Sequence, residues 1–430
     1  MTSPRLALRV LCDTDVERVH AAALSMLGEH AAAAERAVTA APETVLLAGR
    51  EASRDVVLGG GSVWLAAGGP SALARPVEGG AARRGTAADL VSALRLAEVL
   101  PEVGVVTCPP VLADDSSLLD DLRLCLETTT KHILAATLQG GAHAEVAVRM
   151  GAAVAGGVAA LRRRPLLSLI GGPDSAEAAL VFARAGLPVG FYAHLAPQAP
   201  EPVADFARAL ACHHAGVLSA CRQVQAAAPG APFIYTVPPA EVLAGDVEEP
   251  ALFALAALQM ASHVGLPACC ASLATRAVEV GWRACTDNAL VVLSASAAGG
   301  PLLVGAGTLA AGAVFSPQAL VLDAELFSWN ARIADGITID AERLAVAEIE
   351  QVGIGGNYLG RRHTRTHARG VWRPRILDRS PWDAWEASGR AGAPEKADAV
   401  SRDYLNSFTP TPLGRAEQEK LSRIVAESGL

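Results

Sequence analysis

Short apolar runs alternate with alanine-rich stretches along most of this chain, and this alternation limits the possible folds more than any other feature. The runs begin 22 to 45 residues apart, which leaves room for a strand, a loop, a helix and a return loop in each interval. Each run is apolar throughout, so both faces of its strand should be buried, as in a parallel sheet. The predicted strands are Val103–Thr107, Ile133–Thr137, Leu166–Ile170, Pro188–Ala193, Phe233–Val237, Pro267–Ala271 and Leu302–Gly305.

Strands of this kind form either a closed barrel or an open doubly wound sheet. An open sheet that binds a nucleotide would carry a glycine fingerprint after its first strand, and none is present. The glycines at 59–61 lack the spacing of a phosphate loop, and we expect them to form the turn of a β-hairpin. We therefore predict an α/β fold, a (β/α)8 TIM barrel. Its eighth strand should lie near Ala319–Leu322 or Gly336–Ile339, and the pattern does not choose between them.

The barrel is expected to occupy residues 99–370, with an extension on each side. Residues 1–98 should hold a helix that starts near Asp15, capped by Thr14, together with the hairpin. Residues 371–430 should form a strap and a helix on the outside of the barrel. The uncharged stretch Ala289–Phe315 is long enough to cross a bilayer, but Gly299, Gly300 and Pro301 interrupt it, so two buried segments are predicted. Helices are expected at Ala144–Leu161, Ser175–Ala185, Val203–Val224 and Leu252–His263.

Charge and cysteine content limit the partners. The formal net charge of −8 argues against a nucleic-acid surface, which needs basic clusters; the run at residues 361–369 is the one exception. The 8 cysteines are scattered without a CxxC pair, and the N-terminus does not resemble a secretory signal. We expect reduced thiols, a cytoplasmic location, and neither nucleic acid nor membrane as a partner.

The block GIGGNYLGRRHTRTHARGVWRPRILDR at residues 353–379 resembles the trimethylamine methyltransferase family. Members carry, in this order, a Gly-Gly pair, an aromatic-Leu pair, an HT…H element, a strap with proline and an Asp-Arg…Trp motif. The segments RDVVLGGGSVWLAAGG, LETTTKHI, GLPVGFY, APFIY and FSPQALVLDAELF are similar to family segments too. The resemblance implies a (β/α)8 barrel whose open end receives a small methylated amine and, opposite it, the corrinoid (cobalamin) of a partner protein.

By this resemblance the chain is a methyltransferase that moves a methyl group from a quaternary or tertiary, betaine-like amine to the Co(I) corrinoid of its partner. It contains standard residues and so resembles the branch without pyrrolysine. A homo-oligomer is expected, and no directly bound metal. The loop CCASLATRAVEVGWRACTDN at 269–288 departs from the family, since Ala277, Glu279 and Arg283 replace its acidic and Gln positions. A non-catalytic amine-binding barrel and a zinc-activated methyltransferase are therefore the alternatives.

A quaternary ammonium has no N–H group, so aromatic faces and carboxylates should recognise it. Aromatic residues make up 4% of the chain, and those near strand ends are candidates because barrel chemistry gathers at the C-terminal ends of strands. The alternative for Phe191 and Tyr235 is that they fill the core. The predicted substrate-binding residues are Phe191, Tyr192, Tyr235, Trp282, Tyr358 and His363.

Glu279 and His194 are the predicted catalytic residues. Glu279 is the carboxylate of the loop after the sixth predicted strand, and His194 lies just past a strand end; a solvated helix residue and an ordinary loop histidine are the alternatives. His363 and His367 have a spacing that can hold zinc on a helix, but neither a following Glu nor a nearby cysteine supports such a site. The predicted corrinoid contacts are Gly355, Gly356, Asn357 and Arg361.

Overall fold

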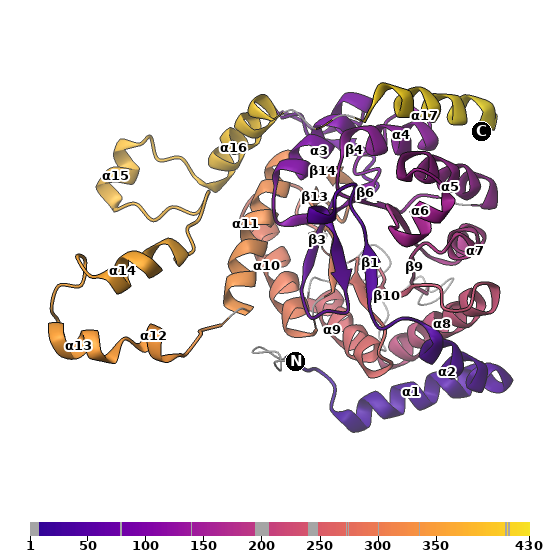
Figure 1. Ribbon diagram of the computed structural model, residues 1–430, viewed down its shortest axis with the longest axis horizontal. Coiled ribbons are helices and arrows are strands. Elements are labelled where there is room, and N and C mark those ends of the chain that lie inside the picture. Colours follow the sequence, from indigo (N-terminus) through magenta and orange to yellow (C-terminus); the bar gives the residue numbers. More distant parts are fainter. Residues whose placement is uncertain are drawn as a thin grey trace.

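A ring of parallel strands with helices around it forms the body of the molecule (Figure 1). The computed structural model describes residues 8–77, 80–138, 140–193, 206–239, 248–271, 273, 275–299, 301–334, 336–408, 411 and 413–430. The barrel is closed, and neighbouring strands pair in parallel. The prediction of an α/β barrel is confirmed. Its strands are β3 (Trp64–Ala67), β6 (Val103–Cys108), β7 (His132–Ala135), β8 (Leu167–Gly171), β9 (Val189–Phe191), β10 (Phe233–Val237), β11 (Ala268–Cys270) and β12 (Leu302–Ala306).

The prediction for the eighth strand was wrong. Strand β3 closes the ring by pairing with β12 on one side and with β6 on the other. Ala319–Leu322 lies within helix α11 (Pro317–Ala334), and residues 336–339 form no strand. The barrel therefore extends beyond residues 99–370 and takes one strand from the N-terminal segment. The apolar run of β3 is short and follows a glycine turn, so its local pattern is that of a hairpin strand.

A β-hairpin does exist, but it forms earlier in the chain than predicted. Strands β1 (Val45–Leu47) and β2 (Val56–Leu58) pair in antiparallel fashion, and the glycines at 59–61 connect this hairpin to β3. The Trp64 indole Nε1 donates a hydrogen bond of 3.2 Å to the Val57 carbonyl oxygen. The hairpin closes the N-terminal end of the barrel, because its side chains pack in one cluster with residues of the lumen. That cluster includes Val45, Leu47, Val56, Leu58, Ala66, Val105, Leu134 and Ile170.

The outer layer of helices follows the predicted alternation with two corrections. The expected helix at 144–161 is divided, because Gly156 and Gly157 have φ of +85° and +124°. Helix α1 begins at Asp13 after Cys12, so the predicted cap at Thr14 is not formed. None of the helices in the described part of the chain is long and apolar enough to span a membrane. The helices are α1 (Asp13–Leu27), α2 (Ala31–Ala40), α3 (Ala87–Val99), α4 (Leu118–Thr128), α5 (Gly141–Ala155), α6 (Val158–Arg163), α7 (Ala176–Ala185), α8 (Phe206–Ala227), α9 (Glu248–His263), α10 (Trp282–Ala297) and α11.

A segment after α11 extends away from the barrel, and we call residues 336–392 the arm (Figure 1, orange to yellow). The arm carries short helices, and the chain then returns to the barrel. Helix α16 packs on α11 and α3, and helix α17 packs on α4 and α5, so both helices lie on the outside of the barrel. These elements are α12 (Ala341–Leu344), α13 (Val346–Val352), α14 (Arg362–His367), α15 (Trp382–Ala387), α16 (Ala393–Ser407) and α17 (Arg415–Ser428).

A small second sheet follows the C-terminal ends of two neighbouring barrel strands. Strands β13 (Thr308–Leu309) and β14 (Val314–Phe315) come directly after β12, and β4 (Leu73–Ala74) and β5 (Arg83–Arg84) come after β3. The Gly68 amide donates a hydrogen bond of 2.7 Å to the Ala306 carbonyl oxygen, which joins the ends of β3 and β12. This sheet therefore covers one side of the C-terminal end of the barrel.

The hairpin at the N-terminal end should contribute substantially to stability. Leu58 is fully buried in the lumen cluster, so Leu58→Ala should lower the free energy of unfolding by about 2–5 kcal/mol. Val57 is exposed on the same strand, so Val57→Ala should change it by no more than about 0.5 kcal/mol. Urea unfolding of both variants checks this. Equal effects would mean that the hairpin does not pack into the barrel.

Candidate functional site

The lumen near the N-terminal end of the barrel contains a buried polar pair. His132 on β7 and Ser168 on β8 are joined by a bond of 2.8 Å between the imidazole Nε2 and the hydroxyl. His132 Nδ1 lies 3.0 Å from the Pro165 carbonyl oxygen, which can only accept, so Nδ1 carries the proton and Nε2 accepts from Ser168. Burial lowers the pKa of His132 to about 4, so the ring is neutral. This pair holds the closed end of the barrel together.

Above this pair the lumen is apolar and tightly filled. A Cβ atom on Gly190 would lie 2.6 Å from Ile170 Cγ1 and 2.7 Å from Thr236 Oγ1, so a larger residue does not fit in the middle of β9. The absence of a side chain at this position leaves room for its neighbours on β8 and β10. The other members of this layer are Ala66, Val105, Leu134, Ile234, Cys269, Leu302 and Val304.

At the C-terminal end the lumen presents hydroxyl groups and one aromatic ring. Thr107 and Thr236 point inward by the alternation of β6 and β10, and both are fully buried. The Thr107 hydroxyl has no hydrogen-bond partner among the described residues, and Thr236 Oγ1 donates to the Ile234 carbonyl oxygen at 3.4 Å. Tyr192, directly after β9, is half-buried and packs against the lumen cluster, as does Ala271 after β11. Among the lumen residues that the structure describes, none carries a formal charge.

Two of the predicted aromatic contacts face the helices instead of the lumen. Tyr235 is fully buried, and its hydroxyl lies 3.2 Å from His214 Nδ1 on α8. Burial raises the pKa of this phenol, which therefore stays protonated and donates to the imidazole. Phe191 lines a hollow between α7 and α8, beside Cys212. Of the three aromatic residues predicted on β9 and β10, the structure places Tyr192 inside the lumen, and the other two pack outside it.

The loop after β11 lies on the rim of the barrel, where its backbone is fixed by hydrogen bonds. The amides of Ala310 and Ala311 donate to the carbonyl oxygens of Ala277 and Thr275, each at 2.8 Å. The same loop exposes Glu279 to solvent. Trp282, the first residue of α10, is 88% exposed, so its ring does not form part of the lumen. His194, the other predicted catalytic residue, lies outside the described residues.

Buried carboxylates behind the rim were missed by the sequence analysis. Asp323 on α11 accepts hydrogen bonds of 2.8 Å from the Gly307 amide at the end of β12 and from Asn288 Nδ2 on α10. Burial raises the pKa of Asp323 to about 6. Glu325, two residues further along α11, accepts a hydrogen bond from the Arg375 amide at 2.8 Å. The signal was present in FSPQALVLDAELF, where two carboxylates interrupt an otherwise apolar helix.

The surroundings of Cys269 and Lys131 indicate structural roles for both residues. All 8 cysteines are free, Cys269 is fully buried, and burial raises the pKa of its thiol. The Lys131 amine is buried at the N-terminal end of β7 and donates hydrogen bonds of 2.6 Å and 2.8 Å to the carbonyl oxygens of Ala97 and Leu100. Burial lowers its pKa to about 7. The Lys131 amine therefore lies at the end of the barrel opposite to the rim.

The predicted corrinoid contacts and two predicted substrate contacts lie on the arm, away from the lumen of the same chain (Figure 1). The Tyr358 hydroxyl donates to the Gly353 carbonyl oxygen at 2.9 Å, and Arg361 lies 3.9 Å from Glu348. The rings of His363 and His367 are 4.3 Å apart. The chain therefore does not bring Gly355, Gly356, Asn357, Tyr358, Arg361 and His363 to its own barrel end. Within the described ranges, no group of three or more His, Cys, Asp or Glu residues is arranged to hold a metal ion.

Comparison with known proteins covers nearly the whole chain. Residues 12–428 match the family described as trimethylamine methyltransferase (MTTB). The chain belongs to this family. The resemblance predicted from the sequence and the methyltransferase class are thereby confirmed. The barrel also resembles the crystal structure of the monomethylamine methyltransferase of Methanosarcina barkeri, with a TM-score of 0.54 over 94% of this chain and 89% of that one; at 10% identity this likeness concerns the fold alone.

Two relatives from the same genus align over most of their length. The chain is 28% identical over 411 residues to a trimethylamine methyltransferase MttB of Desulfitobacterium hafniense (strain DSM 10664 / DCB-2), which covers 92% of this chain and 82% of the relative. It is 26% identical over 415 residues to a glycine betaine methyltransferase of Desulfitobacterium hafniense (strain Y51), which covers 92% and 86%. These two relatives are thus named for two different methylated amines, trimethylamine and glycine betaine.

Buried neutral histidines should make this member of the family sensitive to mild acid. Burial lowers the pKa of His132 and His213 to about 4 and that of His214 to about 3, against about 6.5 in an unfolded chain. The contribution of these neutral histidines to the free energy of unfolding is fully present above pH 6.5. It is lost as the pH falls, by up to about 1.4 kcal/mol per pH unit for each histidine. Asp323 has the opposite effect because its pKa is raised. As the pH falls, it offsets the loss in the free energy of unfolding by at most the contribution of one histidine.

Urea unfolding at pH 7, 6 and 5 measures the effect, and the free energy of unfolding should fall at each step. His213→Gln should reduce the slope against pH, whereas His30→Gln, at an exposed histidine, should leave it unchanged. A free energy of unfolding that stays constant from pH 7 to pH 5 would show that these histidines are not buried in neutral form.

Proposed function

We propose that this chain transfers a methyl group from a quaternary or tertiary, betaine-like amine to the Co(I) corrinoid of a separate protein. The family match over residues 12–428 supports the reaction class, and the names of the aligned relatives support a methylated amine as donor. The observation that carries the proposal is Tyr192, an aromatic ring in the lumen at the C-terminal end of a closed barrel. Catalytic residues of TIM barrels gather at this end.

The chemistry of the lumen suits a methylated amine. A quaternary nitrogen has no proton to donate, so it needs an aromatic face more than a hydrogen-bond acceptor, and Tyr192 supplies such a face. The attraction between the cation and the electron-rich face of the ring offsets the free energy lost when the cation gives up its water shell. The Thr107 hydroxyl has no hydrogen-bond partner among the described residues. It can therefore donate a hydrogen bond to a substrate oxygen, such as one of a betaine carboxylate. The site would thus bind the cation at the rim and the carboxylate deeper in the lumen.

The corrinoid supplies the nucleophile that takes the methyl group, so the barrel has to bind the amine, orient its methyl group and exclude water. Glu279, exposed on the rim loop, can balance the positive charge of the amine from outside the lumen. We assign the arm residues no contact with the corrinoid at the barrel end of their own chain. The free cysteines suit the reducing cytoplasm, where we expect the enzyme to act.

A barrel that binds the amine without transferring its methyl group is the second candidate. The rim loop favours it, since its carboxylate Glu279 faces solvent and the described lumen is neutral. The two candidates differ in turnover and not in binding. Adding the purified chain to free cob(I)alamin with trimethylamine or glycine betaine, and following the cobalamin absorbance, separates them.

Formation of methylcobalamin that depends on both amine and enzyme is the expected result. Amine binding by calorimetry without methylcobalamin, also in the presence of a corrinoid-carrying protein, would favour the binding barrel. An absence of both binding and turnover across a panel of methylated amines would contradict both candidates.

Tyr192 should affect amine binding through its ring. Tyr192→Ala should raise the dissociation constant for a quaternary amine about 2- to 30-fold, because a cation–π contact contributes about 0.5–2 kcal/mol. Tyr192→Phe keeps the aromatic face and should stay close to the parent chain. Phe191→Ala, next in sequence but outside the lumen, is the matched control and should leave binding unchanged. Calorimetry on the three variants would count against the site if Phe191→Ala weakened binding more than Tyr192→Ala.

A further inference from the structure

The arm exposes large apolar side chains along its whole length. Ile354 is 100% exposed and Leu359 is 80% exposed, on the loop between α13 and α14. A soluble protein rarely leaves so many large apolar groups in water unless another surface covers them. The other exposed apolar residues of the arm are Ile337, Ile339, Leu344, Val346, Ile349, Val371 and Trp382.

An apolar groove of about 930 Å³ runs along α10 and α11. It lies beside the place where the arm contacts α11 at Trp329 and Trp372, which we call the root of the arm. Both helices contribute exposed side chains, so the groove is open to solvent. Its far end is Trp282, the residue that follows the rim loop of the barrel. The exposed apolar residues that line the groove are Trp282, Leu290, Leu293, Trp329 and Ile333.

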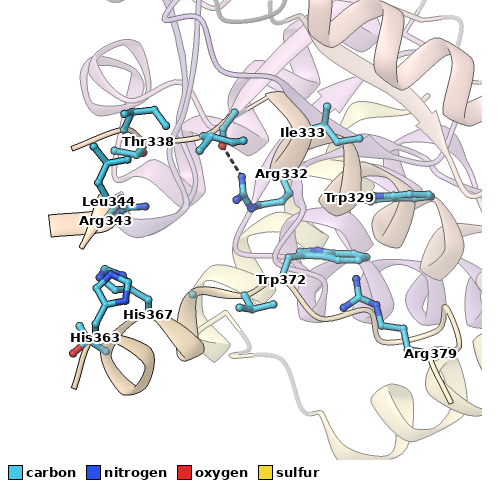
Figure 2. Close-up of a pocket in the computed structure, with 16 residues that line it drawn as sticks. Trp329, Arg332, Ile333, Thr338, Arg343, Leu344, His363, His367, Trp372 and Arg379 are labelled. Atoms are coloured by element: carbon cyan, nitrogen blue, oxygen red, sulfur yellow. Dashed lines mark hydrogen bonds between the residues drawn. The ribbon is translucent and has the colours of Figure 1, made fainter. Parts of the chain in front are cut away.

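The returning part of the arm is fixed against α11 beside this groove, which Leu377 of the arm also lines. Figure 2 shows the Trp329 ring of α11 stacked on Trp372 of the returning chain, with centroids 6.3 Å apart and planes at 16°. Arg379 lies over the other side of the Trp372 ring, with its Cζ atom 5.5 Å from the centroid. Glu325 also forms an ion pair of 3.4 Å with Arg375. The arm is thus held at α11 where it begins and again at residues 372–375, and the segments with α12–α14 and with α15 extend outward (Figure 1).

The total surface of the chain is larger than that of a compact monomer. A folded monomer of 44.1 kDa exposes about 15,500 Å², whereas this chain exposes 19786 Å². This excess of about 4,300 Å² on one chain is larger than the roughly 800 Å² that each partner buries in a standard stable interface. The chain therefore has enough surplus surface for an extensive contact with another copy.

The charges of the arm are unevenly distributed along it. Residues 340–350 are mostly acidic and residues 361–373 are basic, and the two segments approach each other within one arm, where Arg361 lies 3.9 Å from Glu348. The acidic residues are Asp340, Glu342, Glu348 and Glu350, with Arg343 among them. The basic residues are Arg361, Arg362, Arg365, Arg369 and Arg373.

We propose that two copies of this chain exchange arms, so that the arm of each lies in the groove between α10 and α11 of the other. The contact is isologous, since the same two surfaces are used twice across a two-fold axis. It covers the apolar residues of the arm and of the groove at the same time. The conspicuous block at residues 353–379 then belongs to the interface between copies.

The oligomeric state of the full chain tests this proposal. Analytical ultracentrifugation should give twice the 44.1 kDa chain mass for the parent protein. An arm variant, Ile354→Asp with Leu359→Asp, and a groove variant, Leu290→Asp with Leu293→Asp, should each raise the dimer dissociation constant at least tenfold. Val158→Asp changes an exposed apolar residue on α6 and should leave it unchanged. Far-UV circular dichroism shows that each variant is folded.

Mixing the two variants identifies the contact itself. Neither variant alone keeps an intact arm–groove contact, but a mixed dimer pairs the intact arm of one chain with the intact groove of the other. The mixture should therefore dimerise more tightly than either variant alone. A monomeric parent chain at micromolar concentration, variants that dimerise as the parent does, or a mixture without recovery would each overturn the proposal. So would a monomer whose groove binds a corrinoid-carrying protein.

Discussion

The structure depends on closure of the strand ring by β3. Without this strand, β6 and β12 would each present unpaired amide and carbonyl groups at an open edge, which favours pairing with other chains. Its pairing with both neighbours closes the backbone hydrogen bonding of the barrel and aligns the C-terminal ends of all barrel strands at one rim. The hairpin of β1 and β2 closes the opposite end, so a small substrate has to enter from the rim.

The polar groups are divided between the lumen and the outer shell in a way that suits the proposed reaction. Inside the lumen the described groups are neutral, with Tyr192 and Thr107 at the end where a methylated amine would bind. Carboxylates lie behind the rim, where Asp323 and Glu325 accept hydrogen bonds from backbone amides. They fix the end of β12 and the return of the arm. In the proposed reaction the barrel would bind the amine in this neutral lumen, and the corrinoid of a separate protein would supply the nucleophile.

The arm explains why a conspicuous sequence block does not contribute to the barrel lumen of its own chain. Residues 353–379 are rich in glycine, arginine and histidine, a composition typical of ligand binding, yet they extend from the root at Trp329 and Trp372 into solvent. The same block exposes large apolar residues such as Ile354 and Leu359, which an interface between two copies would cover. Assembly and catalysis would then use adjoining surfaces, because the groove ends at Trp282, next to the rim loop.

Seven barrel strands, the family and the class of reaction could be inferred from the sequence, because buried parallel strands and motif order leave local, continuous patterns. The eighth strand could not, since WLAA at residues 64–67 is short and becomes a barrel strand only by pairing with residues far away in the chain. Site prediction was limited by the same cause. Phe191 and Tyr192 are neighbours in sequence, but the register of β9 in the closed ring turns one to the helices and the other to the lumen. Local sequence determined which segments form strands and helices, and tertiary pairing decided which side of each strand faces the substrate and which segments leave the barrel.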